Sequence, residues 1–375
     1  MIVIITKEEK NKNNNSEEYN SIINIKRMLK RLIGMQDLNY DEAKASIKAL
    51  FLDDNISDIL KAAFLTALSM KGESIEELRA VLDFMLENAV KIHVNTSSRV
   101  IDTCGTGGDN VKTFNVSTAA AFIASACDVY VAKHGNRAVS SVMGSADLLE
   151  YLGYNLDTDA GKIKECIEGI GIGFLFAPKF HPIMKRIASI RKELGIRTVF
   201  NLVGPLSNPV NINAQIVGVS SPTLLKKIAQ ILKDLREEVM VFHAIDGMDE
   251  LSNTCINKVV YVKDYEVKEY DLDPKSIGLE YASIKDLSVN SRDDVVKIFL
   301  DVINGNAKNA VEDIAVLNAS AALIIGNKAD RFSDAIDSAR SAVRSGKAYC
   351  KLRDLIAMCG NIDRLRELED MYRLN

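Results

Sequence analysis

The sequence predicts an α/β protein with two parts: a small all-helical domain and a larger α/β domain whose central, mostly parallel sheet is flanked by helices. Two observations lead to this fold class. Residues 21–89 show helical periodicity without a strand pattern, and after residue 96 short β-branched runs alternate with helical segments. With 375 residues, the chain is long enough for two such domains.

The small helical domain is expected over residues 21–95. Residues 74–77 have the Ser-x-x-Glu pattern of a capping box, which marks a helix start. The apolar residues after it fall on one helical face: Leu78, Val81, Leu82 and Met85. We expect residues from about 165 to 203 to return to this domain, although periodicity alone does not decide it. Residues 1–20 are expected to be a mobile extension, because polar residues dominate them.

The α/β domain is expected over residues 96–164 and 204–375. Its predicted elements are strand 100–102, helix 117–126, strand 129–132, helix 144–152, strand 215–219, helix 222–235 and strand 239–243. This alternation is typical of a parallel sheet with helices on both faces. Residues 258–272 predict a hairpin, and residues 292–374 are almost all helical.

Charge and composition argue against several classes of protein. The net charge of -4 offers no basic surface for nucleic acid, so we expect no nucleic-acid partner. The 6 cysteines include no C-x-x-C pair, which favours neither a disulfide framework nor a zinc site and indicates a reducing, cytoplasmic location. No segment approaches the roughly 18 apolar residues of a membrane span, so no membrane association is expected.

The segment Gly105-Thr-Gly-Gly-Asp109 follows the first predicted strand of the α/β domain and precedes a helix that Ser117 or Thr118 can cap. Ligands of open parallel sheets bind beyond the carboxyl ends of the strands. Glycines let backbone N–H groups approach a ligand, and a helix N-terminus favours an anion. These features indicate a phosphate or pyrophosphate site. A merely tight strand-to-helix turn explains the composition equally well.

A second polar loop, Lys133-His-Gly-Asn-Arg137, follows the second predicted strand. Ser140, Ser141 and then Gly144-Ser-Ala-Asp147 come next, and the last segment opens another helix. A cation, hydroxyl groups and a helix start at an equivalent strand end predict the second half of the same polyanion site. Surface residues without a ligand are the alternative.

Asp249 and Glu250 follow a third predicted strand. Adjacent carboxylates repel each other unless a cation lies between them, and Mg²⁺ commonly takes one or two carboxylates together with substrate phosphate oxygens. A solvated acidic turn is the alternative, and the two candidate phosphate loops favour magnesium. Arg191 can recognise a carboxylate through its planar guanidinium, although an Arg in a helix more often forms a surface ion pair.

Together these segments resemble the anthranilate phosphoribosyltransferases, the tryptophan-pathway members of the nucleoside phosphorylase-like phosphoribosyltransferases. The resemblance covers residues 21–353 and rests on the joint order of segments 105–109, 113–118, 133–137, 144–147, 176–182, 197–206 and 246–250. It implies an enzyme that transfers the 5-phosphoribosyl group from 5-phosphoribosyl 1-diphosphate (PRPP) to the amine of anthranilate. The products are N-(5-phosphoribosyl)anthranilate and pyrophosphate. It also implies a homodimer with the active site in a cleft between the domains.

The resemblance further implies the ligand contacts. PRPP would contact Gly105, Gly108, Asp109, Thr113, Asn115, Val116, Ser117, Thr118, Lys133, His134, Gly135, Asn136, Arg137, Ala138, Val139, Ser140, Ser141 and Ser145. Anthranilate would contact Gly105, His134, Asn136, His181, Arg191 and Pro205. Ser117, Asp249 and Glu250 would hold Mg²⁺, with two ions per protomer, and no residue is expected to act as acid or base. Val142-Met143 depart from the polar or small pair that the family commonly has.

Two other functions are compatible with this architecture. A pyrimidine nucleoside phosphorylase would bind inorganic phosphate and a nucleoside, but the acidic pair suits a metal-bound diphosphate better, and phosphorolysis of thymidine or uridine would distinguish the two. A non-catalytic relative that binds nucleic acid would need a basic surface, which the net charge of -4 does not indicate.

Overall fold

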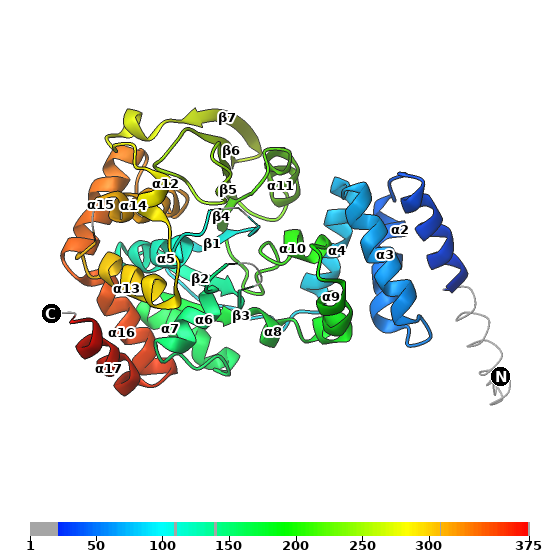
Figure 1. Ribbon diagram of the computed structural model, residues 1–375, viewed down its shortest axis with the longest axis horizontal. Helices are drawn as coiled ribbons and strands as arrows, with labels where there is room; N and C mark the ends of the chain where they lie inside the picture. The colour runs from blue at the N-terminus through cyan, green and yellow to red at the C-terminus, as the bar shows by residue number, and fades with distance from the viewer. Residues whose placement is uncertain (1–21, 109–110, 139–140, 308, 374–375) are drawn as a thin grey trace. The chain divides into compact units, whose positions relative to one another are not determined.

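The computed structural model describes residues 22–108, 111–138, 141–307 and 309–373 (Figure 1). The chain forms two compact units. Unit 1 is Met1–Ala89 with His181–Ser207, and unit 2 is Val90–Phe180 with Asn208–Asn375. The extension expected over residues 1–20 lies outside the described residues.

Unit 1 is all-helical, as predicted. Its elements are a helix over residues 22–33, α2 (Tyr40–Leu52), α3 (Asp58–Lys71), α4 (Ile75–Glu87), the 3-10 helix η1 (Pro182–Ile187), α9 (Ala188–Leu194) and α10 (Val199–Val203). The ring of Phe51 on α2 lies 5.0 Å from that of Phe84 on α4 and 5.6 Å from that of Phe200 on α10, measured between centroids. The later chain segment therefore contributes to the same core as the earlier one.

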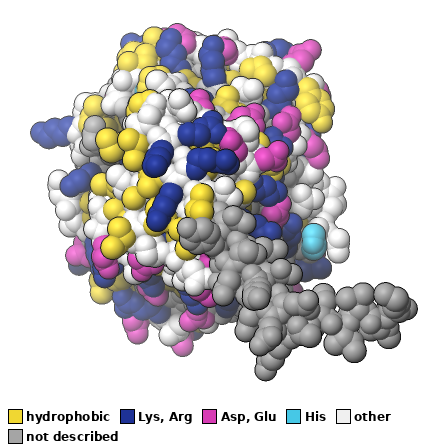
Figure 2. Space-filling model, turned by 90° about the vertical axis from the view of Figure 1, so that its right-hand side faces the viewer, with side chains coloured by type: hydrophobic (Ala, Val, Ile, Leu, Met, Phe, Trp, Pro, Cys, Tyr) yellow, Lys and Arg dark blue, Asp and Glu magenta, His cyan; other side chains and the backbone are white. Residues whose placement is uncertain are grey.

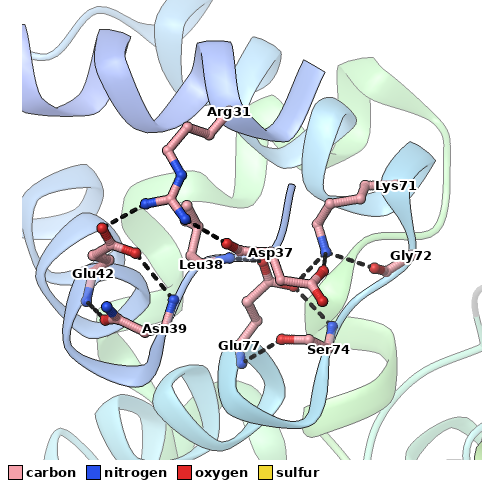
Figure 3. Close-up of polar contacts among 9 residues, drawn as sticks. All are labelled: Arg31, Asp37, Leu38, Asn39, Glu42, Lys71, Gly72, Ser74 and Glu77. Carbon is pink, nitrogen blue, oxygen red and sulfur yellow. Dashed lines mark hydrogen bonds and ion pairs between the residues drawn. The ribbon is translucent and has the colours of Figure 1, made fainter. Parts of the chain in front are cut away.

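A buried carboxylate joins three parts of unit 1 (Figure 3). Glu77 is fully buried and forms the predicted capping box, in which the Ser74 N–H donates to Glu77 Oε2 at 2.8 Å. Glu77 Oε1 accepts the N–H of Leu38 at 2.9 Å, and Oε2 accepts from Lys71 Nζ at 2.8 Å. Burial acts to lower the pKa of Lys71, but its hydrogen bonds to Asp37 and Glu77 raise it above its ordinary value.

Unit 2 is built on a seven-stranded sheet of order β3-β2-β1-β4-β5-β6-β7. The strands are β1 (Val100–Gly105), β2 (Tyr130–Gly135), β3 (Ile172–Phe176), β4 (Ala214–Gly218), β5 (Glu238–Ala244), β6 (Asn257–Lys263) and β7 (Glu266–Leu272). The first five in this spatial order pair in parallel, and β6 and β7 are antiparallel. The mostly parallel sheet and the hairpin over residues 258–272 are thus confirmed.

Helices cover both faces of the sheet. Neighbouring residues of a strand point to opposite sides, so each face presents apolar side chains to the helices that cover it. Ile163 of α7 (Ala160–Ile170) packs with Leu175 on one face, whereas α5 (Val116–Ala126) and α14 (Asn309–Ile325) share the core with Phe174 on the other. The remaining helices are α6 (Ser145–Tyr151), α8 (Ala177–Phe180), α11 (Leu224–Leu232), η2 (Pro274–Ile277), α12 (Ile284–Leu287), α13 (Arg292–Ile303), α15 (Phe332–Arg344), α16 (Lys347–Cys359) and α17 (Ile362–Tyr372). Within the described residues, no helix combines the length and apolar character needed to cross a membrane.

Strand β3 corrects the expected boundary of the second helical segment. Residues 172–176 pair with β2 in the sheet, so the return to unit 1 begins at His181 rather than near residue 165, and it ends at Ser207 rather than 203. Ile172 is the only β-branched residue of this strand and Gly173 follows it, so the sequence pattern typical of a strand is weak here. A Cβ at Gly173 would lie 2.7 Å from Cγ1 of Ile167, so the glycine allows α7 to pack closely on β3.

Candidate functional site

Three parallel strands of unit 2 end in a glycine at the same edge of the sheet. These are Gly105 of β1, Gly135 of β2 and Gly218 of β4, and Gly105 pairs with Gly218 in register. The loop after β5, which contains Asp249, reaches the same edge, because Asp249 packs on both Gly105 and Gly218. The structure therefore brings together the three chain segments in which the sequence predicts a phosphate and metal site.

The glycine loop after β1 encloses a carboxylate of the protein itself. The Gly107 N–H donates to Asp249 Oδ2 at 2.6 Å, and Asp249 is only 8% exposed. A Cβ at Gly105 would collide with this carboxylate, and a Cβ at Gly218 would collide with the Asp249 carbonyl oxygen. Gly107 and Gly108 have φ angles of +68° and +81°, which favour glycine. The packing of the loop thus requires these glycines independently of any ligand.

Glu250 binds the start of α5. Its Oε1 accepts the N–H of Ser117 at 3.1 Å. Helix α5 begins at Val116 with Asn115 at the N-cap, and Asn115 makes no side-chain cap bond. The expectation that Ser117 or Thr118 caps this helix is therefore wrong: both lie inside its first turn, where Glu250 from a distant loop supplies an acceptor.

Lys133 lies within the sheet beneath these loops and is 3% exposed. Its Nζ donates to the Thr103 carbonyl at 2.7 Å and lies 3.4 Å from Ser117 Oγ. Asp102, on the neighbouring strand, is fully buried and accepts the N–H groups of Thr103 and His134 at 2.8 and 3.3 Å. Burial raises the pKa of Asp102 and lowers that of Lys133, and the two charges oppose each other's shifts.

Sequence reasoning missed Asp102 as part of this site. A carboxylate that directly follows two apolar strand residues was the available signal, because a buried carboxylate needs a cation or several hydrogen-bond donors nearby.

The loop after β2 is tied to the start of α5. Asn115 Nδ2 donates to the Met143 carbonyl at 3.1 Å, so the two candidate phosphate loops lie next to each other. Arg137, expected to contact PRPP, donates to Asp147 at 3.0 Å and to Glu150 at 2.7 Å. The guanidinium of Arg137 is thus paired with carboxylates of the protein.

Most other expected PRPP contacts lie in the last residues of β1 and β2, in the loops after these strands, or at the starts of α5 and α6: Gly105, Gly108, Thr113, Asn115, Ser117, Lys133, His134, Gly135, Asn136, Ala138, Ser141 and Ser145. Val116 and Thr118 are buried in the first turn of α5. Asp109, Val139 and Ser140 lie outside the described residues. Asn115 Oδ1 and Thr118 Oγ1 are buried and have no hydrogen-bond partner among the described residues, which leaves both atoms able to bond a polar ligand.

Asp249, Glu250 and Ser117 provide a donor set that fits magnesium. Two adjacent carboxylates lie beside a hydroxyl-bearing helix start, and each carboxylate is held by a backbone N–H. The described part of the chain contains no cluster of three or more His, Cys, Asp or Glu side chains that could hold an ion unaided. Mg²⁺ fits such a set because it commonly completes its coordination with water and substrate phosphate oxygens, whereas structural zinc sites need four protein ligands.

Three expected anthranilate contacts lie in the second segment of unit 1: His181, Arg191 and Pro205. Arg191 donates to Asn201 Oδ1 at 3.2 Å, and its guanidinium lies 5.5 Å from the centroid of the Phe200 ring. Burial lowers the pKa of Arg191, and no charged group among the described residues opposes that shift. His181 is 3% exposed, and burial lowers its pKa, so its ring is neutral near pH 7.

Two family models match the two kinds of domain. Residues 97–349 match the glycosyl transferase family, a/b domain, and residues 26–89 match the glycosyl transferase family, helical bundle domain. The chain therefore has the two domains of a glycosyl transferase. One is a helical unit, and the other contains a sheet whose carboxyl edge carries two glycine-bearing loops and an acidic pair.

Individual relatives show which family of glycosyl transferases the chain belongs to. The chain is 44% identical over 333 residues to the anthranilate phosphoribosyltransferase of Acetivibrio thermocellus, covering 88% of this chain and 96% of that protein. The solved anthranilate phosphoribosyltransferase of Thermus thermophilus matches with a TM-score of 0.81 at 37% identity, over 88% of this chain and 98% of that one. The Saccharomyces cerevisiae enzyme in complex with PRPP and Mg matches with a TM-score of 0.80 at 25% identity, over 92% and 98% of the two chains. The chain belongs to the anthranilate phosphoribosyltransferase family.

Proposed function

We propose that this protein transfers the 5-phosphoribosyl group of PRPP to the amine of anthranilate, a step of tryptophan biosynthesis that releases pyrophosphate. One observation carries the proposal: Asp249 and Glu250 are bonded to the backbone of Gly107 and Ser117, at the glycine loop and at the start of α5. Such an acidic pair beside phosphate loops suits a metal-bound diphosphate. It suits neither the inorganic phosphate of a nucleoside phosphorylase nor a nucleic-acid backbone as well.

In this proposal the loops after β1 and β2 bind the phosphates of PRPP. Lys133 supplies a positive charge within the sheet, where the charge of Asp102 opposes the effect of burial. Asn115 and Thr118 each offer a buried polar atom that no described residue bonds. Asp109, Val139 and Ser140 stay predicted contacts.

Asp249, Glu250 and Ser117 would hold magnesium, with two ions per protomer expected from the family. Magnesium bound there would neutralise charge on the diphosphate and stabilise the pyrophosphate as it leaves. The protein's own part is to fix the two carboxylates, which the N–H groups of Gly107 and Ser117 do at 2.6 and 3.1 Å.

Arg191 would bind the carboxylate of anthranilate. It is a partly buried guanidinium whose lowered pKa no charged group among the described residues opposes, and an anion in bidentate geometry would satisfy it. Gly105, His134, Asn136, His181 and Pro205 stay predicted anthranilate contacts.

The reaction needs positioning and charge stabilisation rather than proton transfer. Breaking the ribose C1–O bond develops positive charge on the sugar and negative charge on the leaving pyrophosphate. The attacking arylamine is neutral near pH 7 and reacts through its lone pair, so no strong base is required. Alignment of two reactants can contribute roughly 7 to 11 kcal/mol to catalysis.

The direct test is to incubate the protein with PRPP, MgCl2 and anthranilate and to follow anthranilate fluorescence. We expect the fluorescence to fall only when all three are present and to stay constant when EDTA is added. The control is phosphorolysis of thymidine or uridine with inorganic phosphate. A constant anthranilate signal in the complete mixture, or nucleoside cleavage, would contradict the proposal.

We also propose that the protein is a cytoplasmic homodimer. All six cysteines are free, as in a reducing compartment. Large apolar side chains are exposed on unit 1: Ile33, Met35, Ile59 and Met70. Hydrophobic side chains lie among Lys and Arg on the face shown in Figure 2, and exposed apolar side chains are a property of association surfaces. Size-exclusion chromatography with light scattering tests the dimer, and a monomer mass at micromolar concentration would exclude it.

A further inference from the structure

A single carboxylate oxygen joins both ends of the loop between β2 and α6. Asp147 Oδ2 accepts the backbone N–H groups of Ala138 at 2.8 Å and of Gly144 at 3.0 Å. Ala138 lies shortly after β2 ends, and Gly144 is the N-cap of α6. Ala138 is itself an expected PRPP contact, and two more, Ser141 and Ser145, lie close to Gly144 in the chain.

The second oxygen of Asp147 holds Arg137, whose Nη1 donates to Oδ1 at 3.0 Å. Arg137 also donates to both oxygens of Glu150, at 2.7 and 2.9 Å. The side chains of Arg137 and Glu150 are 47% and 48% exposed, whereas that of Asp147 is 18% exposed. The pair of Arg137 with Glu150 is therefore screened by solvent, and Asp147 is the inner member of the group.

The backbone around Asp147 is closely packed. A Cβ at Gly144 would lie 2.6 Å from the carbonyl carbon of Arg137 and 2.7 Å from the carbonyl oxygen of Asn136. The two ends of the loop thus meet through their backbones, and the N–H groups of Ala138 and Gly144 both need an acceptor at this point. Asp147 supplies it with one atom.

Asp147 is in the right ionisation state for this role. Partial burial acts to raise its pKa, but hydrogen bonds from Ala138, Arg137 and Gly144 together lower it below its ordinary value. An ionised carboxylate only accepts hydrogen bonds, as the geometry around both oxygens requires.

We infer that Asp147 is a positioning residue for PRPP, which acts by holding together the ends of the loop after β2. The inference rests on the proposed function. Asp147 acts through the backbone at Ala138 and Gly144, because a carboxylate that touched the phosphates directly would repel them. Neither the expected PRPP contacts nor the expected metal ligands include Asp147.

The test compares Asp147→Ala with Asp147→Asn. The alanine variant removes the acceptor from both N–H groups, and we expect KM for PRPP to rise roughly 10- to 100-fold, the equivalent of about two hydrogen bonds. The asparagine variant keeps a neutral oxygen acceptor, so its KM for PRPP should rise only about two- to fivefold. In both variants kcat, and KM for anthranilate at saturating PRPP, should change by less than about threefold.

Asn361→Ala is the matched control for lost stability. Asn361 Oδ1 also accepts two backbone N–H groups, those of Asp363 and Arg364 at 3.0 and 3.3 Å, at the start of α17. We expect Asn361→Ala to lower Tm about as much as Asp147→Ala does and to leave KM for PRPP unchanged. If Asp147→Ala does not fold, the selective rise in Asp147→Asn carries the test.

Three results would overturn the inference. These are an unchanged KM for PRPP in the folded Asp147 variants, an equal rise in both KM values, and a rise in KM for PRPP in Asn361→Ala. Calorimetric titration of wild-type protein and variants with PRPP and MgCl2 separates this inference from the proposed function. If the wild type binds PRPP but does not consume anthranilate, the proposed function fails while the role of Asp147 in PRPP binding is still measured.

Discussion

Glu77 in unit 1 and Asp147 in unit 2 occupy the same local position, the third residue of a helix, and serve different ends. Each accepts the N–H of its own N-cap residue and a second N–H from outside the helix. Glu77 is fully buried and paired with Lys71, whereas Asp147 is partly exposed and paired with Arg137, which is half in solvent. The comparison shows that the role of each carboxylate depends on the N–H group outside its own helix. Through Leu38, Glu77 joins parts of the helical core, and through Ala138, Asp147 joins two points of the loop after β2.

The same contrast holds for the two surrounding regions. Carboxylates of the unit 1 network are paired with cations, as Glu42 is with Arg31 at 2.5 Å and Asp37 with Lys71 at 2.6 Å (Figure 3). At the carboxyl edge of the sheet, Asp249 and Glu250 accept the backbone N–H groups of Gly107 and Ser117, and Glu250 also interacts electrostatically with the buried Lys133. Substitutions in the Glu77 network of unit 1 should therefore change stability, and those of Asp249 and Glu250 should change catalysis.

The largest expected effect is that of Glu77→Ala on stability. It leaves the N–H of Leu38 without its acceptor and Lys71 without its buried partner. Breaking a buried ion pair costs about 3–5 kcal/mol, and we expect the free energy of unfolding from urea titration to fall by that amount. Glu76→Ala, at the exposed neighbouring position, should change it by less than about 0.5 kcal/mol. Lost activity without lost stability in Glu77→Ala would break the comparison.

Substitution of the acidic pair, Asp249 and Glu250, should lower activity more than stability, the reverse of what we expect for Glu77→Ala. Asp249→Ala and Glu250→Ala are each expected to lower kcat roughly 100- to 1000-fold in the magnesium-dependent assay, because charge stabilisation at the leaving group is lost. Their stability should fall by less than that of Glu77→Ala, and the hydrogen bond to a backbone N–H that each loses contributes about 1 kcal/mol to this fall. Glu280→Ala, at an exposed position of unit 2, is the control. Full magnesium-dependent turnover in both variants would refute the metal assignment.

Arg191→Ala tests whether unit 1 also contributes a residue to substrate binding. Loss of a charged hydrogen-bond pair should raise KM for anthranilate roughly 10- to 100-fold and KM for PRPP by less than about twofold. Arg186→Ala is the matched control, because Arg186 lies in the same segment and pairs with the exposed Asp54 at 2.9 Å. An equal effect of Arg191→Ala on both substrates would indicate a structural role.

The smallest expected effect concerns pH. The pKa of Asp147 is lowered in the folded protein, so its ionised form contributes stability above the unfolded pKa near 4, and this stability is lost as the pH falls through the folded value. The difference in Tm between wild type and Asp147→Asn should therefore shrink from about pH 5 downward. A difference that stayed constant to about pH 3 would show that ionisation of Asp147 does not stabilise the fold.

Features with a local sequence signal could be predicted. The Ser-x-x-Glu pattern at 74–77 predicted a capping box, and the glycine and acidic segments at strand ends predicted one shared edge; the structure contains both. The remote partners could not be predicted, because nothing in the sequence around Glu77 marks Leu38, and nothing around Asp147 marks Ala138.

Two misses have specific physical causes. Strand β3 was overlooked because it has one β-branched residue, Ile172, and because Gly173, which makes room for Ile167, weakens the strand pattern further. Asp102 was overlooked because its buried charge is stabilised by Lys133, and the sequence alone does not show that Lys133 lies on the neighbouring strand. Only Asp102 depends on a neighbour that is distant in the sequence, because Ile167 lies in the helix directly before β3.

The division of unit 1 into two chain segments has a consequence for synthesis. The ribosome releases residues 22–89 first, but the ring of Phe200, 5.6 Å from that of Phe51, is made only after Val90–Phe180 has been translated. Until then the early helices lack part of their apolar covering, and the cost of closing so long a connection slows their final packing. The domain that comes first in the sequence is therefore completed only after β1, β2 and β3 of the second have emerged.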